Sequence, residues 1–210
     1  MKRTCMVLMA VLAVTLCADD AVRQIRMDCN GDLNITGAAN PVSAQVAKPR
    51  FEDNSAIVFG AKNRILLPQC KMLQSASGTL EMRIKSINWN GSDNTYKYFF
   101  YARKGNGADV VFLRKNEEGK IEFSIGKLPH DLATLTADAS FWEPNQYHTL
   151  KIIWDKEKMA MFVDGRQAAE RKRQYQELQW SDPLWIGGSI WGTSFGDSAL
   201  DYFRLAPKAE

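Results

Sequence analysis

The isolated carboxylates of this chain bear first on catalysis, because a glycosidase needs two of them about 5 to 10 Å apart across the bond it cleaves. Within a strand, that geometry requires acids at positions i and i+2, and between strands it requires acids at facing positions. Glu81, Glu122 and Glu143 each stand alone, and Glu117 and Glu118 lie in a segment typical of a turn. Exposed charge is the usual role of such residues. The pattern disfavours hydrolysis by a local pair and leaves acids from different strands as an alternative.

Zinc and nucleophilic chemistry have little support in the sequence. A zinc site needs a cluster of His, Cys or carboxylate ligands, and the chain contains only His130 and His148. Its one G-x-S-x-G run, the pattern of a nucleophilic serine, is GTSFG at residues 192–196, and no constellation of residues around it is convincing enough for nucleophilic catalysis. We therefore assign no catalytic residue and favour a non-enzyme, with catalysis left open.

Two segments rich in Asn, Asp, Ser and Gly could bind calcium, which takes about six to eight oxygen ligands. These segments are residues 88–94, NWNGSDN, and residues 192–201, GTSFGDSALD. The expected ligands are Asp93, Asp197 and Asp201. The competing interpretation is that these residues only form turns.

Aromatic residues next to polar ones suggest a saccharide site, because sugar rings stack on aromatic side chains while amides and carboxylates bind their hydroxyls. Trp89 and Trp191 lie in the two polar segments, and Tyr98 lies in the aromatic run YKYFFYAR. We expect Trp89, Tyr98, Trp191 and Asp197 to contact a ligand at the loop rim or concave face. The alternative is that protein covers both faces of the aromatic run.

The elements that must position these residues are strands. In YHTLKIIW, residues 147–154, apolar and polar side chains alternate with the period of a half-buried strand. The pair Asp164-Gly165 after MAMFV is a strong hairpin signal. The predicted strands are residues 56–59, 64–67, 78–86, 96–103, 109–114, 120–125, 148–154, 159–163, 183–187 and 200–205. Residues 168–178 are expected to form a strand and a charged loop, and the whole predicts an antiparallel sandwich.

The order of these motifs resembles the concanavalin A-like lectin/glucanase superfamily, specifically its laminin-G-like jelly-roll domains. Tyr147-His148, the VDG hairpin at residues 163–165, the IGG run at 186–188 and the closing strand at 201–205 take corresponding places, and the resemblance covers roughly residues 51–206. It implies an all-β, two-sheet antiparallel jelly roll with a structural role for His148, and it makes calcium at the rim plausible. The E-x-D-x-x-E run of the family's glucanases does not occur here.

The N-terminus indicates export. Lys2 and Arg3 precede an apolar run at residues 6–16, and small residues near Ala18 complete a signal peptide over residues 1–18. Residues 19–50 are expected to be a linker or irregular cap, and residues 51–206 the sandwich domain. Lipid anchoring at Cys17 is an alternative, although Leu16 is not the small residue which that signal requires.

Removing the signal peptide takes two charges from the formal net charge of +3 and leaves about +1. The mature chain then has no electrostatic reason to bind nucleic acid or an anionic membrane, and its apolar run is shorter than the ~20 residues of a membrane span. Cys29 and Cys70 remain and are expected to form a disulfide, with two buried thiols as the alternative.

These observations predict a secreted, periplasmic or cell-surface binding module without catalytic activity. Its expected partner is a glycan or polysaccharide, with calcium as a candidate cofactor. A glycoside hydrolase or lyase on the same fold, or a module that binds an extracellular protein, are the alternatives.

Overall fold

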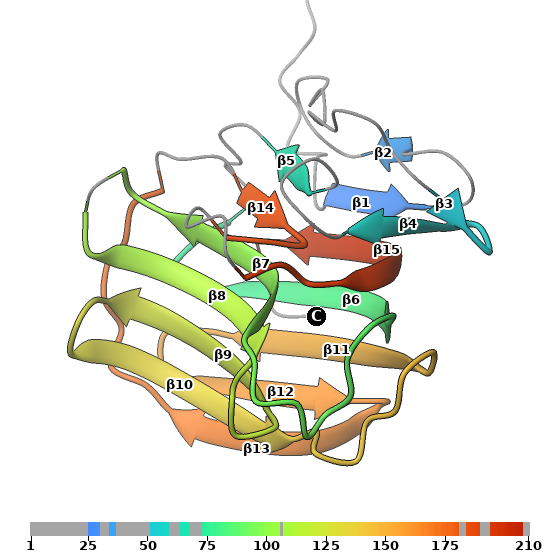
Figure 1. Ribbon diagram of the computed structural model, residues 1–210. Helices are drawn as coiled ribbons and strands as arrows, with labels where there is room; N and C mark the ends of the chain where they lie inside the picture. The colour runs from blue at the N-terminus through green and yellow to red at the C-terminus, as the bar shows by residue number, and fades with distance from the viewer. Residues whose placement is uncertain are drawn as a thin grey trace, which may run out of the picture.

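A computed structural model describes residues 25–29, 34–36, 51–58, 64–67, 73–105, 107–180, 184–189 and 194–207. In this part the chain forms two antiparallel sheets that stack face to face (Figure 1). The predicted all-β, two-sheet sandwich is confirmed. No helix among these residues is long and apolar enough to cross a bilayer.

The larger sheet has its strands in a spatial order different from the chain order. It runs β13 (Arg166–Lys172), β12 (Lys158–Val163), β11 (Tyr147–Trp154), β6 (Gly78–Ser86), β15 (Ser198–Ala206), β1 (Ile25–Asp28) and β2 (Asn34–Thr36). β4 (Ser55–Val58) also pairs with β15, and β3 (Phe51–Glu52) pairs with β4.

The smaller sheet contains β10 (Asp131–Asp138), β9 (Lys120–Lys127), β8 (Asp109–Lys115), β7 (Lys97–Arg103), β14 (Leu184–Ile186) and β5 (Ile65–Leu67), in that order. The strands β7 to β10 are consecutive along the chain and pair as hairpins, whereas β14 arrives from a distant part of the sequence. The sheet thus joins a local meander to two short strands.

The core lies between the sheets and follows the period-two pattern of the strands. In β11, every second residue from His148 to Trp154 is buried, as predicted. Aromatic rings join the two layers: Phe123 of the smaller sheet packs on Trp154 at 5.7 Å between centroids. Phe100 packs on Phe203 of the larger sheet at 6.0 Å. Side chains at the alternate positions therefore face outward, and they make up the two outer faces of the molecule.

The predicted hairpin after β12 is confirmed, with positive φ at both Asp164 (50°) and Gly165 (78°). The Asp164 carboxylate also bonds back to β11. Its Oδ1 accepts the backbone N–H of Thr149 at 2.8 Å, and its Oδ2 lies 2.8 Å from Nδ1 of His148. The His148 ring stacks on Trp142 with centroids 3.9 Å apart. His148 is thus held inside the fold, in the structural role that the resemblance implied.

All ten strands predicted from the sequence are found within two residues of their expected ends. The strand and loop expected at residues 168–178 are also found, as the end of β13 and the irregular segment that follows it. β10 was missed, because its inward side chains include the small Ala133 and Ala137 and give a weak apolar pattern. β1 and β2 form part of the larger sheet, although residues 19–50 were expected to be a linker or irregular cap.

The expected signal peptide at residues 1–18 lies outside the described residues. Cys29 is buried beside β1, and its backbone N–H donates to the carbonyl of Asp201 at 3.0 Å. Cys70 lies outside the described residues, so the Cys29–Cys70 disulfide stays a prediction.

Changing Gly78 to Ala should destabilise the fold. Gly78 pairs with Trp154, and an added Cβ would lie 2.1 Å from Cζ2 of the indole. The ring cannot easily withdraw, because its Nε1 donates to the carbonyl of Gln74 at 2.9 Å. Overpacking of this kind costs about 1–3 kcal/mol. Urea unfolding should show a lower midpoint for Gly78→Ala and little change for Lys158→Ala, an exposed position of the same sheet. Equal midpoints would contradict this packing.

Candidate functional site

Trp89 is a core residue and not a ligand platform. Its side chain is 1% exposed, and its Nε1 donates to the carbonyl of Gly196 at 3.0 Å. Its ring packs against Trp142 at 6.3 Å and against Phe99 at 5.9 Å. The expected stacking of a sugar on Trp89 is therefore wrong, because other aromatic rings already cover the indole. Trp191 lies outside the described residues, and its expected contact with a ligand stays a prediction.

Tyr98 lies on the outer face of the smaller sheet, but only 6% of it is exposed. Its hydroxyl accepts a hydrogen bond from Nη1 of Arg114 at 2.8 Å. Burial, the largest effect, raises the pKa of Tyr98. The Tyr98 hydroxyl therefore belongs to a hydrogen-bond network within the sheet. The ring is too little exposed to stack against a sugar.

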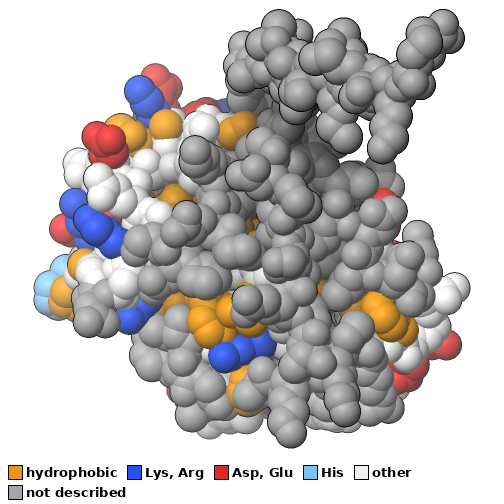
Figure 2. Space-filling model, turned by 90° about the horizontal axis from the view of Figure 1, so that it is seen from above, with side chains coloured by type: hydrophobic (Ala, Val, Ile, Leu, Met, Phe, Trp, Pro, Cys, Tyr) orange, Lys and Arg blue, Asp and Glu red, His pale blue; other side chains and the backbone are white. Residues whose placement is uncertain are grey.

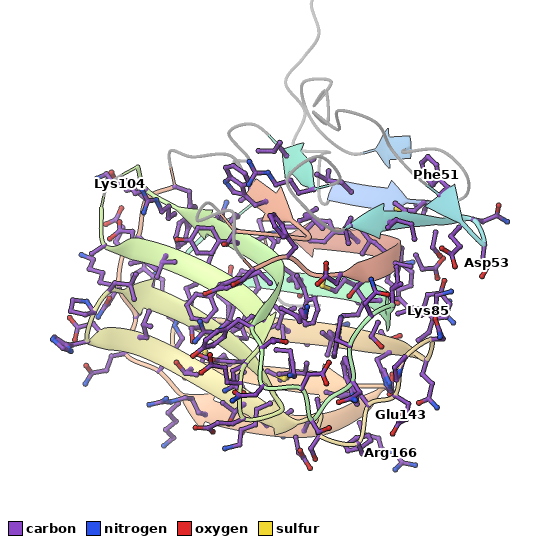
Figure 3. All side chains as sticks on the ribbon, in the orientation of Figure 1. Phe51, Asp53, Lys85, Lys104, Glu143 and Arg166 are labelled. Atoms are coloured by element: carbon purple, nitrogen blue, oxygen red, sulfur yellow. The ribbon has the colours of Figure 1, made fainter. Side chains whose placement is uncertain are left out.

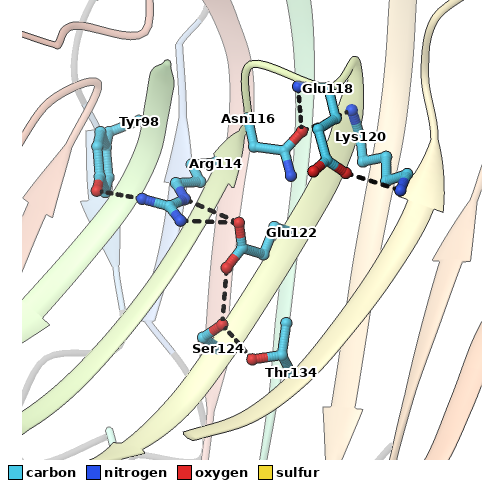
Figure 4. A network of polar contacts seen from close by, with 8 residues as sticks. All are labelled: Tyr98, Arg114, Asn116, Glu118, Lys120, Glu122, Ser124 and Thr134. Atoms are coloured by element: carbon cyan, nitrogen blue, oxygen red, sulfur yellow. Dashed lines mark hydrogen bonds and ion pairs between the residues drawn. The ribbon is translucent and has the colours of Figure 1, made fainter. Parts of the chain in front are cut away.

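That network crosses four strands of the smaller sheet, from β7 to β10 (Figure 4). Arg114 forms an ion pair with Glu122, with Nη2 and Oε2 2.9 Å apart. Oε1 of Glu122 accepts from the Ser124 hydroxyl at 3.2 Å, and Ser124 bonds Thr134 at 2.8 Å. One cation meets one carboxylate, so this network carries no net charge.

The three expected calcium ligands do not converge. The Asp197 carboxylate lies 2.5 Å from the amine of Lys97, and the Asp201 carboxylate lies 2.6 Å from Arg83. Asp93 is a turn residue whose Oδ2 accepts the backbone N–H of Asn90 at 3.1 Å. Across the described ranges, no three His, Cys, Asp or Glu residues come close enough to hold a metal. Calcium at the rim thus finds no support in the geometry.

Lys115 provides a cation where the sequence suggested a metal. The residue is fully buried, and its amine donates to the backbone carbonyl of Asp93 and, at 3.3 Å, to that of Thr95. Burial lowers the pKa of Lys115, while the nearby Asp93 carboxylate opposes that shift. The segment at residues 88–95 is thus bound through its carbonyl oxygens to a lysine amine.

The outer face of the larger sheet carries a more accessible polar cluster. Its members come from alternate positions of three neighbouring strands, β11, β6 and β15, with Asp201 at the irregularity of β15. We call this cluster the outer polar face, and it consists of Tyr147, Thr149, Lys151, Glu81, Arg83, Lys85, Asp201, Tyr202 and Arg204.

Tyr202, Glu81 and Arg204 form the centre of the outer polar face. The Tyr202 hydroxyl donates to Oε1 of Glu81 at 2.7 Å. The same carboxylate oxygen lies 3.7 Å from Nη1 of Arg204, whose guanidinium also lies over the Tyr202 ring at 4.8 Å. Burial and the Glu81 carboxylate raise the pKa of Tyr202, so its hydroxyl stays protonated at neutral pH and acts as a donor.

Tyr147 lies at one end of the outer polar face. Its hydroxyl bonds the Ser55 hydroxyl at 2.6 Å, and the guanidinium of Arg83 lies 4.2 Å from the ring centroid. The amine of Lys85 lies 5.2 Å from the same centroid and 3.4 Å from the Asp53 carboxylate. Figure 3 shows Asp53 and Lys85 together at one edge of the molecule, far from Lys104.

The accessibility of the two outer faces differs. On the larger sheet, the side chains of Arg83 and Arg204 are 41% and 37% exposed. On the smaller sheet, those of Arg114 and Glu122 are 20% and 12% exposed. A ligand can therefore reach the guanidinium groups of the outer polar face more easily than the network around Arg114.

Two of the carboxylates weighed for hydrolysis, Glu81 and Glu122, lie on opposite faces of the sandwich. Glu81 is on the outer face of the larger sheet and Glu122 on the outer face of the smaller sheet, with the core between them. They cannot flank one glycosidic bond.

A shallow polar groove of about 350 Å³ lies elsewhere, at the end formed by the β7–β8 turn. Gln179 closes it, since its side chain accepts from Lys104 at 2.9 Å and its backbone N–H donates to Asp109 at 3.0 Å. Viewed from above, Figure 2 shows basic and acidic side chains intermixed along the left edge of the molecule. Neither the groove nor this edge carries a cluster of side chains of one charge.

Sequence reasoning missed the outer polar face. A signal was present, because the predicted strands at residues 78–86, 148–154 and 200–205 carry polar or aromatic residues at their outward positions. The sequence did not show that these three strands are neighbours, with β6 between β11 and β15.

A family model described as Concanavalin A-like lectin/glucanases superfamily, Laminin_G_3, matches residues 59–209. A search of curated proteins finds no match.

Solved structures of botulinum neurotoxin binding domains share the fold. The serotype D binding domain superposes with a TM-score of 0.65 at 14% identity, covering 90% of this chain and 48% of that one. A structure of botulinum neurotoxin type C, whose cell entry depends on interaction with two ganglioside molecules, gives a TM-score of 0.64 at 14% identity, covering 90% of this chain and 48% of that one. The binding domain of type DC in complex with SialylT gives 0.65 at 12%, covering 89% and 47%. This chain spans about half the length of each, and at these identities the likeness shows the fold alone.

Replacing Lys115 by Met should loosen residues 88–95. The change removes the charged donor of the part-buried hydrogen bonds to the carbonyls of Asp93 and Thr95, and a hydrogen bond to a charged group contributes about 1.5–3 kcal/mol. Hydrogen exchange should show faster exchange at residues 90–95, while Lys120→Met, at a side chain that is 45% exposed, should leave it unchanged. Calcium chloride should not alter the melting temperature of the wild type. A calcium-dependent rise that Asp93→Asn removes would contradict the assignment of Lys115 as the cation of this segment.

Proposed function

This chain belongs to the concanavalin A-like lectin/glucanase superfamily through its laminin-G-like domain, and from that premise we propose that it is a non-catalytic module that binds carbohydrate at the outer polar face. A saccharide site needs a few placed donors and acceptors beside aromatic surface. The observation that carries the proposal is the partly exposed set of Arg83, Arg204, Glu81 and the two tyrosines, brought together from three strands.

The chemistry of this face suits sugar hydroxyls. Arginines donate several hydrogen bonds in fixed directions, and carboxylates accept them. Glu81 and Asp201 supply acceptors, while Arg83, Arg204 and the Tyr202 hydroxyl supply donors. Because these groups already restrain one another on rigid strands, little side-chain entropy is lost when a ligand binds.

The comparisons support this proposal by analogy. Of two neighbours with the same fold, one interacts with gangliosides and the other forms a complex with SialylT. The same superfamily also includes enzymes, so fold alone does not select binding over hydrolysis. The separation of Glu81 from Glu122 favours binding. A module that binds an extracellular protein remains the main alternative.

Export of the protein is part of the proposal and rests on residues 1–18. Expression of the full chain in its source cell should give a mature protein that starts just after Ala18, outside the cytoplasm, as read by N-terminal sequencing. A mature protein that retains Lys2 and Arg3 would contradict export by a cleaved signal peptide.

The test of binding is a glycan and polysaccharide array with the purified mature protein, with and without chelator, and with release of reducing sugar measured in parallel. We expect retention without release. Arg83→Ala should weaken retention about tenfold, because it removes a charge-assisted donor and the group packed on Tyr147.

The matched control is Thr136→Ala, at an exposed position on the outer face of the smaller sheet. It should bind as the wild type does, and both variants should keep the wild-type circular dichroism spectrum. Retention lost equally in the two variants would place the site elsewhere. Release of reducing sugar would indicate an enzyme instead of a binding module. A lack of retention on every glycan would favour a protein partner.

A further inference from the structure

Arg173 is a buried cation at the end of the larger sheet where β11 turns into β12. It follows directly after β13 and is only 9% exposed. Its backbone N–H donates to the carbonyl of Glu157 in that turn at 2.8 Å, and its Nη2 donates to the carbonyl of Ser75 at 2.6 Å. Segments from three parts of the chain thus enclose this guanidinium.

The Arg173 guanidinium is incompletely paired. Its Nε and Nη1 are buried and have no hydrogen-bond partner among the described residues. Burial lowers the pKa of Arg173, and Tyr175 and Asp155 oppose that shift. An arginine keeps its charge in a protein, and a buried charge without a hydrogen-bonded counter-charge is costly. The fold therefore holds a cation whose partner it does not supply.

The other buried cations of the described ranges are paired. They are Lys85 and Lys115. Lys85 forms an ion pair with Asp53, and the Lys115 amine donates to two backbone carbonyls. Arg173 has five N–H donors in its guanidinium, but only Nη2 is bonded. Incomplete pairing is thus specific to Arg173 and not a general property of buried cations in this fold.

The surroundings of Arg173 are basic. Residues 155–158 and 171–173 contain five cations and two carboxylates. Strand pairing brings these two segments together, since Lys158 and Lys172 occupy directly opposite positions. The segment on the other side, which includes Ser75, has no charged residue from 74 to 77. Cations therefore outnumber carboxylates around the buried guanidinium.

The nearby carboxylates are engaged elsewhere or point away. Oδ1 of Asp155 accepts the backbone N–H groups of the next turn residues at 2.8 Å, and this carboxylate forms no ion pair with Arg173. Glu157 is exposed in the same turn. Glu170 lies opposite Ala160 on the outer face of the sheet, and Glu177 lines the polar groove beside Lys104. Within the described residues, none of them completes the guanidinium.

Tyr175 lies beside Arg173 and Lys156. Its ring centroid is 5.8 Å from Cζ of Arg173 and 5.3 Å from the amine of Lys156. The residue is 38% exposed and belongs to the irregular segment after β13. Its side chain can turn without breaking a hydrogen bond between strands. The Tyr175 side is therefore the route by which a ligand can reach the guanidinium.

We propose that Arg173 binds a carboxylate group, with Lys156 as a second cation and Tyr175 as the movable cover of the site. This site goes beyond the proposed function, because it lies at the opposite end of β11 from Tyr147. A planar carboxylate matches a guanidinium in a two-bond geometry. It carries one charge, as Arg173 does, whereas a sulfate would bring a second charge into a buried place at a larger desolvation cost.

The test is a titration of the wild type with sodium acetate, followed by NMR at the Arg173 Nε–H signal, with sodium chloride at equal ionic strength as the reference. We expect a saturable shift with acetate, half complete at about 10–100 mM, as for a single charge-assisted contact. Sodium sulfate should shift the signal less. Arg173→Met should lose the acetate-dependent shifts of the backbone N–H groups at residues 156–158 and 174–176.

Two further variants separate the parts of the site. Lys156→Gln should weaken acetate binding about two- to fivefold, because the amine is an exposed second cation. Arg166→Gln is the matched control, since it removes the same charge at an exposed residue at the other end of β13 and should bind acetate as the wild type does.

The source of the carboxylate can be a small organic acid or an acidic residue of a partner protein. A capped Gly-Glu-Gly peptide and its Gly-Gln-Gly counterpart distinguish them. Tighter binding of the Glu peptide than of acetate, with none of the Gln peptide, would support a protein partner. Binding of acetate alone would support a small acid.

Equal shifts with acetate and chloride would overturn the proposal, because ordered water would then satisfy Arg173. Tighter binding of sulfate than of acetate would overturn the choice of a carboxylate. Acetate shifts that persist in Arg173→Met would place the carboxylate elsewhere. The wild-type titration is decisive even where Arg173→Met does not fold. Glycan binding at the outer polar face is measured separately on the array, so failure here leaves the proposed function standing.

Discussion

The register of β6 is the constraint on which the rest of the structure depends. β6 lies between β11 and β15, and its inward side chains, Leu80, Met82 and Ile84, enter the core. Because side chains alternate along a strand, a slip of one residue would bury the charged side chains of Glu81 and Arg83 and expose the apolar ones. Burial of the apolar face thus fixes the outward residues in place. The outer polar face exists because the core requires this register.

Cationic side chains bond to oxygen atoms of the segments that the sequence marked for calcium. Lys115 donates to the carbonyl oxygens of Asp93 and Thr95, while Lys97 forms an ion pair with Asp197 and Arg83 forms one with Asp201. A calcium ion would make similar contacts, because it also takes carbonyl and carboxylate oxygens. A sequence rich in Asn, Asp and Gly therefore indicates where cations are needed, and tertiary contacts decide whether a metal or a lysine provides them.

The sequence predicted strands well and the site poorly, for physical reasons. Period-two alternation is local, so residues 147–154 and the hairpin at Asp164 could be identified directly. Burial of Trp89 depends on rings that come from distant segments, and its polar neighbours in the sequence gave the opposite impression. Tyr147 and Tyr202 belong to strands that are neighbours only through β6. Their common face depends on strand order, which no local pattern reports.

Proteins of this fold at 12–14% identity share the inward pattern because packing constrains it, whereas outward residues can change without altering the fold. The likeness to toxin binding domains therefore transfers the architecture and leaves the ligand to be argued from the faces. This molecule contains its own comparison, since both sheets carry polar side chains on their outer faces. Arg114 and Glu122 on the smaller sheet are 20% and 12% exposed, whereas Arg83 and Arg204 on the larger sheet are 41% and 37% exposed. Contacts within the sheet already enclose the first pair, while the guanidinium groups of the outer polar face stay within reach of a ligand. The difference in access is therefore what directs the search for a ligand to the larger sheet.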